Sequence, residues 1–130
     1  MAKTLTQKLF IKPGMSLAVL NAPEGYVQTA WQDLPEDVII HDALNESYDQ
    51  VHLFATHEAP LLAQVEDVKA HLKEWGVLWV CYPKGGEKAA VPTDLNRDSL
   101  WASLKPHHLA PNHQIAIDAV WSGLRFKVVE

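Results

Sequence analysis

The sequence predicts an α/β domain with a mostly parallel sheet of about six strands and an antiparallel hairpin at its carboxyl end. Two segments, residues 15–20 (MSLAVL) and 77–82 (VLWVCY), are nearly unbroken apolar runs of strand length. Such runs are typical of strands that are covered on both faces, as in parallel sheets. Strand and helix patterns alternate along the chain, which favours parallel strands connected by helices.

The amino-terminal half begins with a helix and continues into the first of these buried strands. Apolar residues recur at helical spacing from Leu5 to Phe10, and a Lys-Pro-Gly turn follows them. A loop at residues 21–26 comes after the strand. The predicted helices in this half are residues 4–11 and 26–32, and the predicted strands are residues 15–20, 38–40 and 48–54.

The carboxyl-terminal half contains the clearest helix, over residues 58–73. Its apolar side is one stripe, made by Leu61, Leu62, Val65, Val68 and Leu72. Gly76 follows where a helix cap is expected. A second helix is expected to begin with a cap at Thr93 or Asp94 and to end near residue 104. Residues 113–118 and 124–128 alternate in polarity, which predicts a hairpin connected through residues 121–123.

The chain has five tryptophans, and most of them fall in predicted core elements. Trp75, Trp79 and Trp101 are expected to pack against the sheet. Arg97 lies four residues before Trp101, so its guanidinium group is expected over the indole ring. Trp31 and Trp121 fall near predicted loops, where one of them is expected to line a pocket or a subunit contact.

Composition and charge narrow the classes of function. The chain has 130 residues, of which 48% are hydrophobic, so we expect one folded domain over residues 1–130. The formal net charge is −5 with scattered lysines, which argues against nucleic-acid binding. No apolar stretch approaches the roughly 18 residues that a membrane helix needs. The start of the chain lacks a secretory pattern, and the single cysteine fits a reducing compartment, so we expect a cytoplasmic protein.

A ligand site is expected at the carboxyl ends of the parallel strands, where open α/β sheets bind their ligands. This rule selects residues 21–26, His41-Asp42 and residues 82–86. The first loop has only Gly25, and Pro23 lacks an N–H group, so it is unsuited to phosphate. Its residues favour a tight turn fixed by Asn, Pro and Gly, and the alternative is an oxygen-rich rim for a neutral or cationic ligand. The candidate residues in this part of the rim are Asn21, Glu24, Gly25, Tyr26 and Asp42.

The other candidates lie later in the chain, near the loop at residues 83–88. Tyr82 ends the second buried strand, and Lys84 places a cation before the predicted helix start at Thr93 or Asp94. A helix amino terminus beside a lysine is a general anion site. The acidic side chains of Asp94 and Asp98 oppose that use, because they already satisfy the helix dipole. Asp94 and Arg97 complete the list of candidate rim residues.

Metal binding and covalent catalysis are not predicted. The seven histidines form no recognised metal-ligand spacing. No serine lies in a Gly-x-Ser-x-Gly turn. Cys81 lies within an apolar strand and is expected to be a buried, unreactive thiol. We therefore assign no catalytic residue and no metal ligand from the sequence.

Several segments together resemble a small uncharacterised bacterial domain family that is similar to class I S-adenosylmethionine-dependent methyltransferases. The segments are KPGMSLAVLNAPEGY, YDQVHLF, LKEWGVLWVCYPKG, TDLNRDSLW and WSGLRFK. The resemblance covers nearly the whole chain and implies a Rossmann-like fold. Within it, residues 12–25 correspond to the first strand and glycine loop, and Asp42 to the acid that binds ribose.

The chain departs from the methyltransferase pattern at three places. Val19 stands where the first strand usually carries an acid, and Asn21 and Pro23 replace two of the three loop glycines. The segment between residues 40 and 48 is too short for the strand that methyltransferases have there. The resemblance therefore implies the fold and argues against a complete cofactor site.

These observations lead to one main functional hypothesis and two alternatives. The main hypothesis is a non-catalytic domain without a cofactor, whose vestigial rim binds a small ligand or a protein. The first alternative is a minimal methyltransferase that uses S-adenosylmethionine, Asp42 and the backbone of residues 21–26. The second is a structural subunit whose hairpin edge pairs with another copy of the chain.

Overall fold

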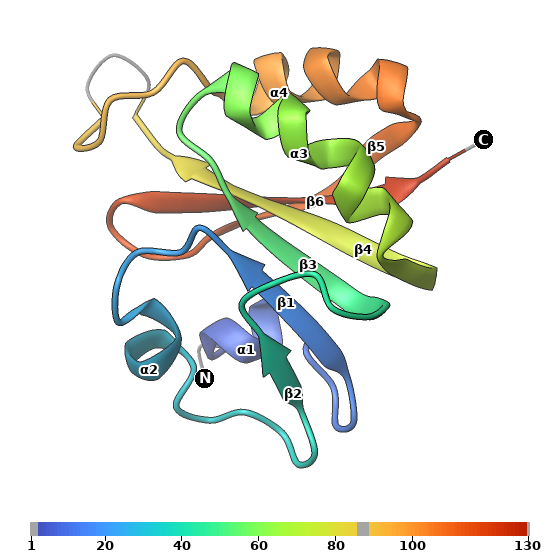
Figure 1. The fold of residues 1–130 in the computed structure, drawn as a ribbon. Helices are drawn as coiled ribbons and strands as arrows, with labels where there is room; N and C mark the ends of the chain where they lie inside the picture. The colour runs from blue at the N-terminus through green and yellow to red at the C-terminus, as the bar shows by residue number, and fades with distance from the viewer. Residues whose placement is uncertain (1–2, 86–88, 130) are drawn as a thin grey trace.

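A computed structural model describes residues 3–85 and 89–129 and contains one six-stranded sheet in the order β2-β1-β3-β4-β6-β5 (Figure 1). The first four strands in this order run parallel, whereas β6 runs antiparallel to β4 and to β5. The predicted fold class is therefore confirmed. The strands are β1 (Ser16–Leu20), β2 (Ile39–His41), β3 (Tyr48–Phe54), β4 (Leu72–Pro83), β5 (Leu109–Ala116) and β6 (Trp121–Val128).

Helices cover both faces of the sheet, as Figure 1 shows. The longer helices α3 (Glu58–Ala70) and α4 (Arg97–Leu104), with the 3-10 turn η2 (Lys105–His107), lie on one face. The short helices α1 (Leu5–Lys8) and α2 (Tyr26–Ala30) lie on the other face. Each face has its own apolar core, so the domain consists of three layers.

The position of β1 between two apolar cores explains why its sequence is apolar at every residue. Ala18 and Leu20 pack in the core beneath α3 and α4, whereas Leu17 and Val19 pack in the core beneath α1 and α2. All five residues of β1 are buried. A strand between two parallel neighbours and two helical layers has no solvent-facing side, which confirms the prediction from the apolar run.

Helix α3 is shorter than predicted, and the structure places Gly76 differently. The helix ends at Ala70, and Leu72 already belongs to β4. Gly76 is inside β4, where a Cβ atom would lie 2.8 Å from the carbonyl oxygen of Lys73 and 2.9 Å from that of Tyr48 on β3. The prediction of a helix cap is therefore wrong, because this glycine instead allows β4 to pass close to β3.

Strand β4 bulges at the same place. Tyr48 of β3 pairs with Leu72, but Gln50 pairs with Val77, so additional residues of β4 leave the ladder. Within this bulge, Trp75 has a φ of 69° and its side chain is 91% exposed. The predicted packing of Trp75 is wrong because the bulge turns this side chain to solvent. Trp79, beyond the bulge, is fully buried as predicted.

Helix α4 begins later than predicted. Its cap is Asn96, whose side chain accepts a hydrogen bond from the backbone N–H of Ser99 while Ser99 Oγ accepts one from Asn96 N–H. Trp101 is 51% exposed, so the expectation that it faces inward is wrong. The cation–π contacts found among the described residues belong to Arg125, and Arg97 makes none with Trp101.

The carboxyl-terminal hairpin is confirmed, with its turn three to four residues earlier in the chain than expected. Ser122 and Gly123 lie within β6, and residues 117–120 connect the strands. Asp118 closes this turn by accepting hydrogen bonds from the backbone N–H groups of Val120 and Trp121, each at 2.8 Å.

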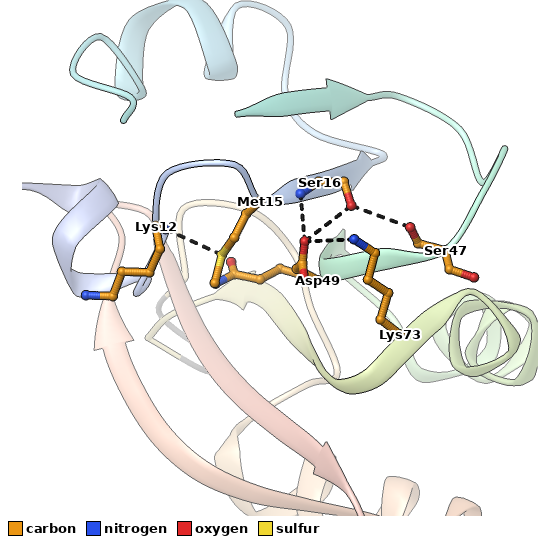
Figure 2. Close-up of polar contacts among 7 residues, drawn as sticks. Lys12, Met15, Ser16, Ser47, Asp49 and Lys73 are labelled. Carbon is orange, nitrogen blue, oxygen red and sulfur yellow. Dashed lines mark hydrogen bonds and ion pairs between the residues drawn. The ribbon is translucent and has the colours of Figure 1, made fainter. Parts of the chain in front are cut away.

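Asp49, near the start of β3, forms side-chain contacts with β1 and β4 (Figure 2). Its Oδ2 atom accepts a hydrogen bond from the backbone N–H of Ser16 at 2.8 Å and one from Lys73 Nζ at 3.2 Å. Because Lys73 belongs to the bulged part of β4, this carboxylate connects β1, β3 and β4.

Among the residues that the structure describes, no helix has the length and apolar character needed to span a membrane.

Candidate functional site

A cavity of about 620 Å³ opens at the carboxyl ends of the neighbouring parallel strands β1 and β2. This is the edge that the sequence predicts for a ligand. The wall contains both apolar and polar residues. The apolar ones include Val19, Val27 and Ile40, and the polar ones include Asn21, His41, Asp42 and Asn45.

The bend after β1 has a backbone conformation that favours glycine at two positions, although only one of them is a glycine. Asn21 has a φ of 61° and Gly25 a φ of 77°, both in the left-handed region. Asparagine tolerates this region better than most residues. Asn21 therefore forms a bend that glycine would favour, whereas Pro23 lacks the N–H group that a nucleotide-binding loop offers.

A buried tyrosine organises the loop that carries Asp42. The Tyr48 hydroxyl lies 2.9 Å from the carbonyl oxygen of Ala43, 3.0 Å from the backbone nitrogen of Asn45 and 2.7 Å from His41 Nδ1. The hydroxyl has one proton, which it donates to the carbonyl of Ala43, and its lone pairs accept the other two hydrogen bonds. The loop at residues 42–47 is thereby attached to the core in place of an additional strand.

This arrangement determines which nitrogen of His41 carries a proton. Because the Tyr48 hydroxyl has no second proton to donate, His41 Nδ1 must be the donor. In the neutral ring, Nε2 is then a hydrogen-bond acceptor. His41 lines the cavity, so the ring adds an acceptor beside the exposed carboxylate of Asp42.

A second cavity of about 520 Å³ lies next to the first, between the end of β3 and helix α3. Phe54 and Trp121 line it, and their rings meet edge to face with centroids 5.1 Å apart. Asn21 borders both cavities, and its side-chain amide donates a hydrogen bond of 3.0 Å to Gln64 Oε1. A ligand that occupies both cavities must accommodate this contact. Of the two tryptophans predicted near loops, Trp121 therefore lines a pocket, whereas Trp31 is buried in the core.

The rim residues predicted in the first loop are only partly brought together. Asn21 and Asp42 line the same cavity, whereas Glu24 is exposed and lies outside its wall. Gly25 precedes α2 as its cap residue. Tyr26 is buried against Phe54 and Trp31 in the core, and this burial raises the pKa of its hydroxyl.

The remaining predicted residues lie away from both cavities. The Tyr82 hydroxyl accepts a hydrogen bond from Gln114 at 2.9 Å, and its burial raises its pKa. Lys84 donates its backbone N–H to Val120, and residues 86–88 of the same predicted loop lie outside the described residues. Arg97 lines a small separate cavity with Trp101.

Asp94 has a structural role that the sequence did not indicate. Its Oδ1 atom accepts a hydrogen bond of 2.8 Å from the backbone N–H of Glu58, the first residue of α3. It therefore caps α3 across a long sequence separation rather than beginning α4. An anion site between Lys84 and a helix start at Asp94 is not formed, because that helix starts after Asn96.

The titratable side chains of Cys81 and His52 are fully buried in the sheet, that of Cys81 as predicted. Burial raises the pKa of the Cys81 thiol and lowers the pKa of His52 to about 3, so both side chains stay neutral in the folded protein. His52 Nε2 lies 2.7 Å from Gln50 Oε1, and the ring packs edge to face on Trp31. Across the described ranges, no cluster of three potential metal ligands is found.

Sequence reasoning selects His41 and expects one loop tryptophan at a pocket, but it misses the roles of Tyr48 and Gln64. It does not predict the contact between Tyr48 and His41. Their connection depends on a side chain of β3 reaching the loop after β2. A tyrosine at the first position of an apolar strand, after a short polar loop, was the available signal.

No protein-family model matches the sequence, and no curated protein matches it. Solved structures do match the fold. A ribosomal protein L11 methylase from Lactobacillus delbrueckii subsp. bulgaricus is similar with a TM-score of 0.65 and 12% identity, over 97% of this chain and 75% of that one. A DhpI–SAH complex has a TM-score of 0.64 and 12% identity over 92% and 78% of the two chains.

A third similar structure is a SAM-dependent methyltransferase from Aquifex aeolicus, with a TM-score of 0.60 and 13% identity over 92% of this chain and 85% of that chain. The chain has a methyltransferase-like fold. Identities this low establish the fold alone. The described sheet has β2 at its edge, so the strand expected between residues 40 and 48 of a complete methyltransferase is missing from it.

Proposed function

We propose that the chain is a minimal methyltransferase that binds S-adenosylmethionine at the carboxyl ends of β1, β2 and β3. The observation that carries the proposal is that Asp42 and Asn21 border one cavity beside a bend that keeps its left-handed backbone. The similarity to structures named as a SAM-dependent methyltransferase and a DhpI–SAH complex supports the choice of ligand. This proposal replaces the non-catalytic hypothesis as the leading one.

The first cavity suits the adenosine part of the ligand. The Asp42 carboxylate is exposed and accepts no hydrogen bond from another described side chain, so both oxygens are available to the two ribose hydroxyls. Val19, Val27 and Ile40 supply an apolar wall for a flat base. Val19 replaces an acid of the methyltransferase pattern, which makes this wall more apolar.

The second cavity suits the charged part of the ligand. When bound, S-adenosylmethionine supplies a methyl group activated by a sulfonium cation. Phe54 is buried, but the half-buried Trp121 beside it offers an indole ring whose face attracts a cation. The chain's contribution to the reaction is then orientation of the methyl group toward an acceptor and exclusion of water.

The proposal is tested by isothermal titration calorimetry with S-adenosylhomocysteine. We expect saturable binding to the unmodified chain and at least about tenfold weaker binding to Asp42→Asn, because a ribose diol loses a charged acceptor. Glu24→Gln is the matched control, since Glu24 is exposed and lies outside the cavity wall. Absence of binding, or equal binding by Asp42→Asn, would reject the proposal.

A second candidate, a non-catalytic ligand-binding domain, is favoured by the Asn21–Gln64 hydrogen bond. This bond crosses the border of the two cavities and obstructs a ligand that must occupy both. If it limits the chain to adenosine-like ligands, adenosine and S-adenosylhomocysteine will bind equally well. Asn21→Gly will then improve the binding of S-adenosylhomocysteine and leave that of adenosine unchanged.

Three further parts of the sequence-based interpretation stay proposals. These are the resemblance to a small bacterial domain family, a cytoplasmic location and contact with a second copy through the hairpin. Strand β5 forms that edge, and it contains Pro111 and a bulge between Pro111 and His113. Both features oppose pairing of an edge strand, so a dimer through this edge is the least supported of the three.

A further inference from the structure

A cavity of about 670 Å³ lies at the other end of the sheet, beside the first part of β4 and the last part of β6. We call it the basic cavity because its wall contains one acidic residue, Glu74, and four basic ones. The basic residues are Lys69, Lys73, Arg125 and Lys127. This concentration of positive charge is unexpected in a chain with a formal net charge of −5.

Arg125 is held in this wall by a hydrogen bond and two aromatic rings, without an acidic partner among the described residues. Its Nε–H group donates a hydrogen bond of 2.8 Å to Asn112 Oδ1, and its guanidinium carbon lies 4.4 Å from the Phe10 ring centroid and 5.8 Å from that of Trp79. Burial lowers its pKa, although an arginine remains protonated at neutral pH. Among the described residues, no carboxylate forms an ion pair with it. A fixed, partly buried cation of this kind is stabilised by an anion.

The lysines of the basic cavity differ in whether they already form an ion pair. Lys73 forms an ion pair with the Asp49 carboxylate at 3.2 Å, a contact drawn in Figure 2. Lys69 is 3.6 Å from the carboxylate of Glu66. Lys127 is exposed and forms no ion pair with any described residue. Arg125 and Lys127 are two residues apart on one strand, so their side chains emerge on the same face of the sheet. They are the two cations that an incoming anion can engage without breaking an ion pair.

Trp75 supplies a flat apolar surface beside these cations. Trp75 is one of the residues that line the basic cavity, and it is 91% exposed. Its φ of 69° is strained for an aromatic residue, and the close approach of Gly76 to Tyr48 keeps the bulge in place. Strained backbone that presents a side chain to solvent is a feature of ligand sites.

We propose that the basic cavity binds a small aromatic anion, with Arg125 and Lys127 on its carboxylate or phosphate group and Trp75 against its ring. Guanidinium groups bind both kinds of anion through paired N–H donors. The indole face stacks on flat rings. This site is separate from the proposed cofactor site and does not depend on it.

The test is calorimetric titration of the full chain with phenyl phosphate and with phenylacetate, and benzyl alcohol is the neutral control. We expect saturable binding of at least one anion and none of the alcohol. Lys127→Met and Arg125→Met should each weaken binding at least tenfold. Lys105→Met is the matched control, because Lys105 is exposed and lies outside the cavity wall, and it should leave binding unchanged.

Trp75→Gly separates a binding role from a structural one. Glycine adopts a φ of 69° without strain, so the midpoint of thermal unfolding should stay the same or rise. Anion binding should weaken, because the indole ring is removed. Asp42→Asn should bind the anion as well as the unmodified chain does, which distinguishes this site from the rim. The proposal is overturned if neither anion binds at millimolar concentration, if benzyl alcohol binds equally well, or if Lys127→Met binds like the unmodified chain.

Discussion

The Tyr48 hydroxyl lies 2.7 Å from Nδ1 of His41, and this contact connects the core of the sheet to the edge of the candidate site. Tyr48 is fully buried at the start of β3, whereas His41 ends β2 beside Asp42. The same hydroxyl also holds the loop at residues 42–47 through two backbone groups. A single core side chain therefore positions the carboxylate that we propose binds ribose.

Replacing this tyrosine tests the relationship directly. Tyr48→Phe keeps the ring but removes the hydroxyl, so His41, Ala43 and Asn45 lose a shared partner. We expect a loss of about 1–2 kcal/mol in the free energy of unfolding, measured by urea denaturation. Hydrogen exchange of the Asn45 amide should become faster. Unchanged exchange at Asn45 would show that the hydroxyl does not hold the loop.

The carboxylate of Asp49 is expected to contribute to stability without affecting the rim. Asp49→Ala leaves the buried N–H of Ser16 without its acceptor and Lys73 without its partner. We expect a loss of about 1–3 kcal/mol in unfolding free energy, because the N–H group lies at a buried strand end. Glu46→Ala is the control at an exposed position, where a change within about 0.5 kcal/mol is expected. Equal stabilities of the two variants would contradict the role of Asp49.

Asp94 should behave as a helix cap and not as a ligand-binding residue. Asp94→Ala removes the acceptor for the first N–H group of α3, which should cost about 1 kcal/mol. Asp67→Ala, at an exposed position inside α3, is the matched control. Chemical denaturation measures both. If Asp94→Ala instead weakened S-adenosylhomocysteine binding at unchanged stability, its assignment as a cap would be wrong.

His52 makes stability depend on pH in a defined direction. Its pKa is lowered to about 3 by burial, whereas a histidine in an unfolded chain titrates near pH 6.5. The unfolded state therefore binds the proton first as the pH falls, and stability contributed by the neutral ring is lost between about pH 6.5 and 3. The slope from this one group approaches about 1.4 kcal/mol per pH unit.

The effect is isolated by comparing the chain with His52→Gln, which cannot titrate. The variant should be less stable at pH 7, and its deficit should shrink by about 2 kcal/mol when both proteins are measured at pH 4.5. His57→Gln, at an exposed position, should show no such convergence. A deficit that stays constant with pH would mean that His52 is protonated in the folded state or is not buried.

The fold was predictable because its signals are local. Both apolar runs became central strands, and β3 has the bounds that were predicted for it. The errors occur where contacts between distant segments override local pattern. Gly76 looks like a helix cap in the sequence. In the structure a side chain at this position would collide with backbone atoms, including the carbonyl oxygen of Tyr48 on another strand. Asp94 looks like the cap of the next helix but caps the preceding one.

The site was predictable only in part, for a related reason. The rule for ligand sites in parallel sheets correctly placed Asn21 and Asp42 at one cavity. Composition alone could not indicate that Asn21 keeps a left-handed backbone or that it contacts Gln64 on α3. The sequence argues against a cofactor loop because residues 21–26 contain only one glycine. The shape of the loop depends on its backbone conformation, which Asn21 adopts as well as Gly25 does.

The most direct measurement of the central claim is a titration of the ¹⁵N-labelled chain with S-adenosylhomocysteine, followed by two-dimensional NMR. We expect saturable shifts of the backbone amides of Asn21, Ala22 and Asp42, at the edge where β1 and β2 end. The amides of Asp49 and Lys73, at the opposite end of the sheet, should not move. Shifts confined to that opposite end, or none at millimolar ligand, would contradict the claim that this edge binds an adenosyl ligand.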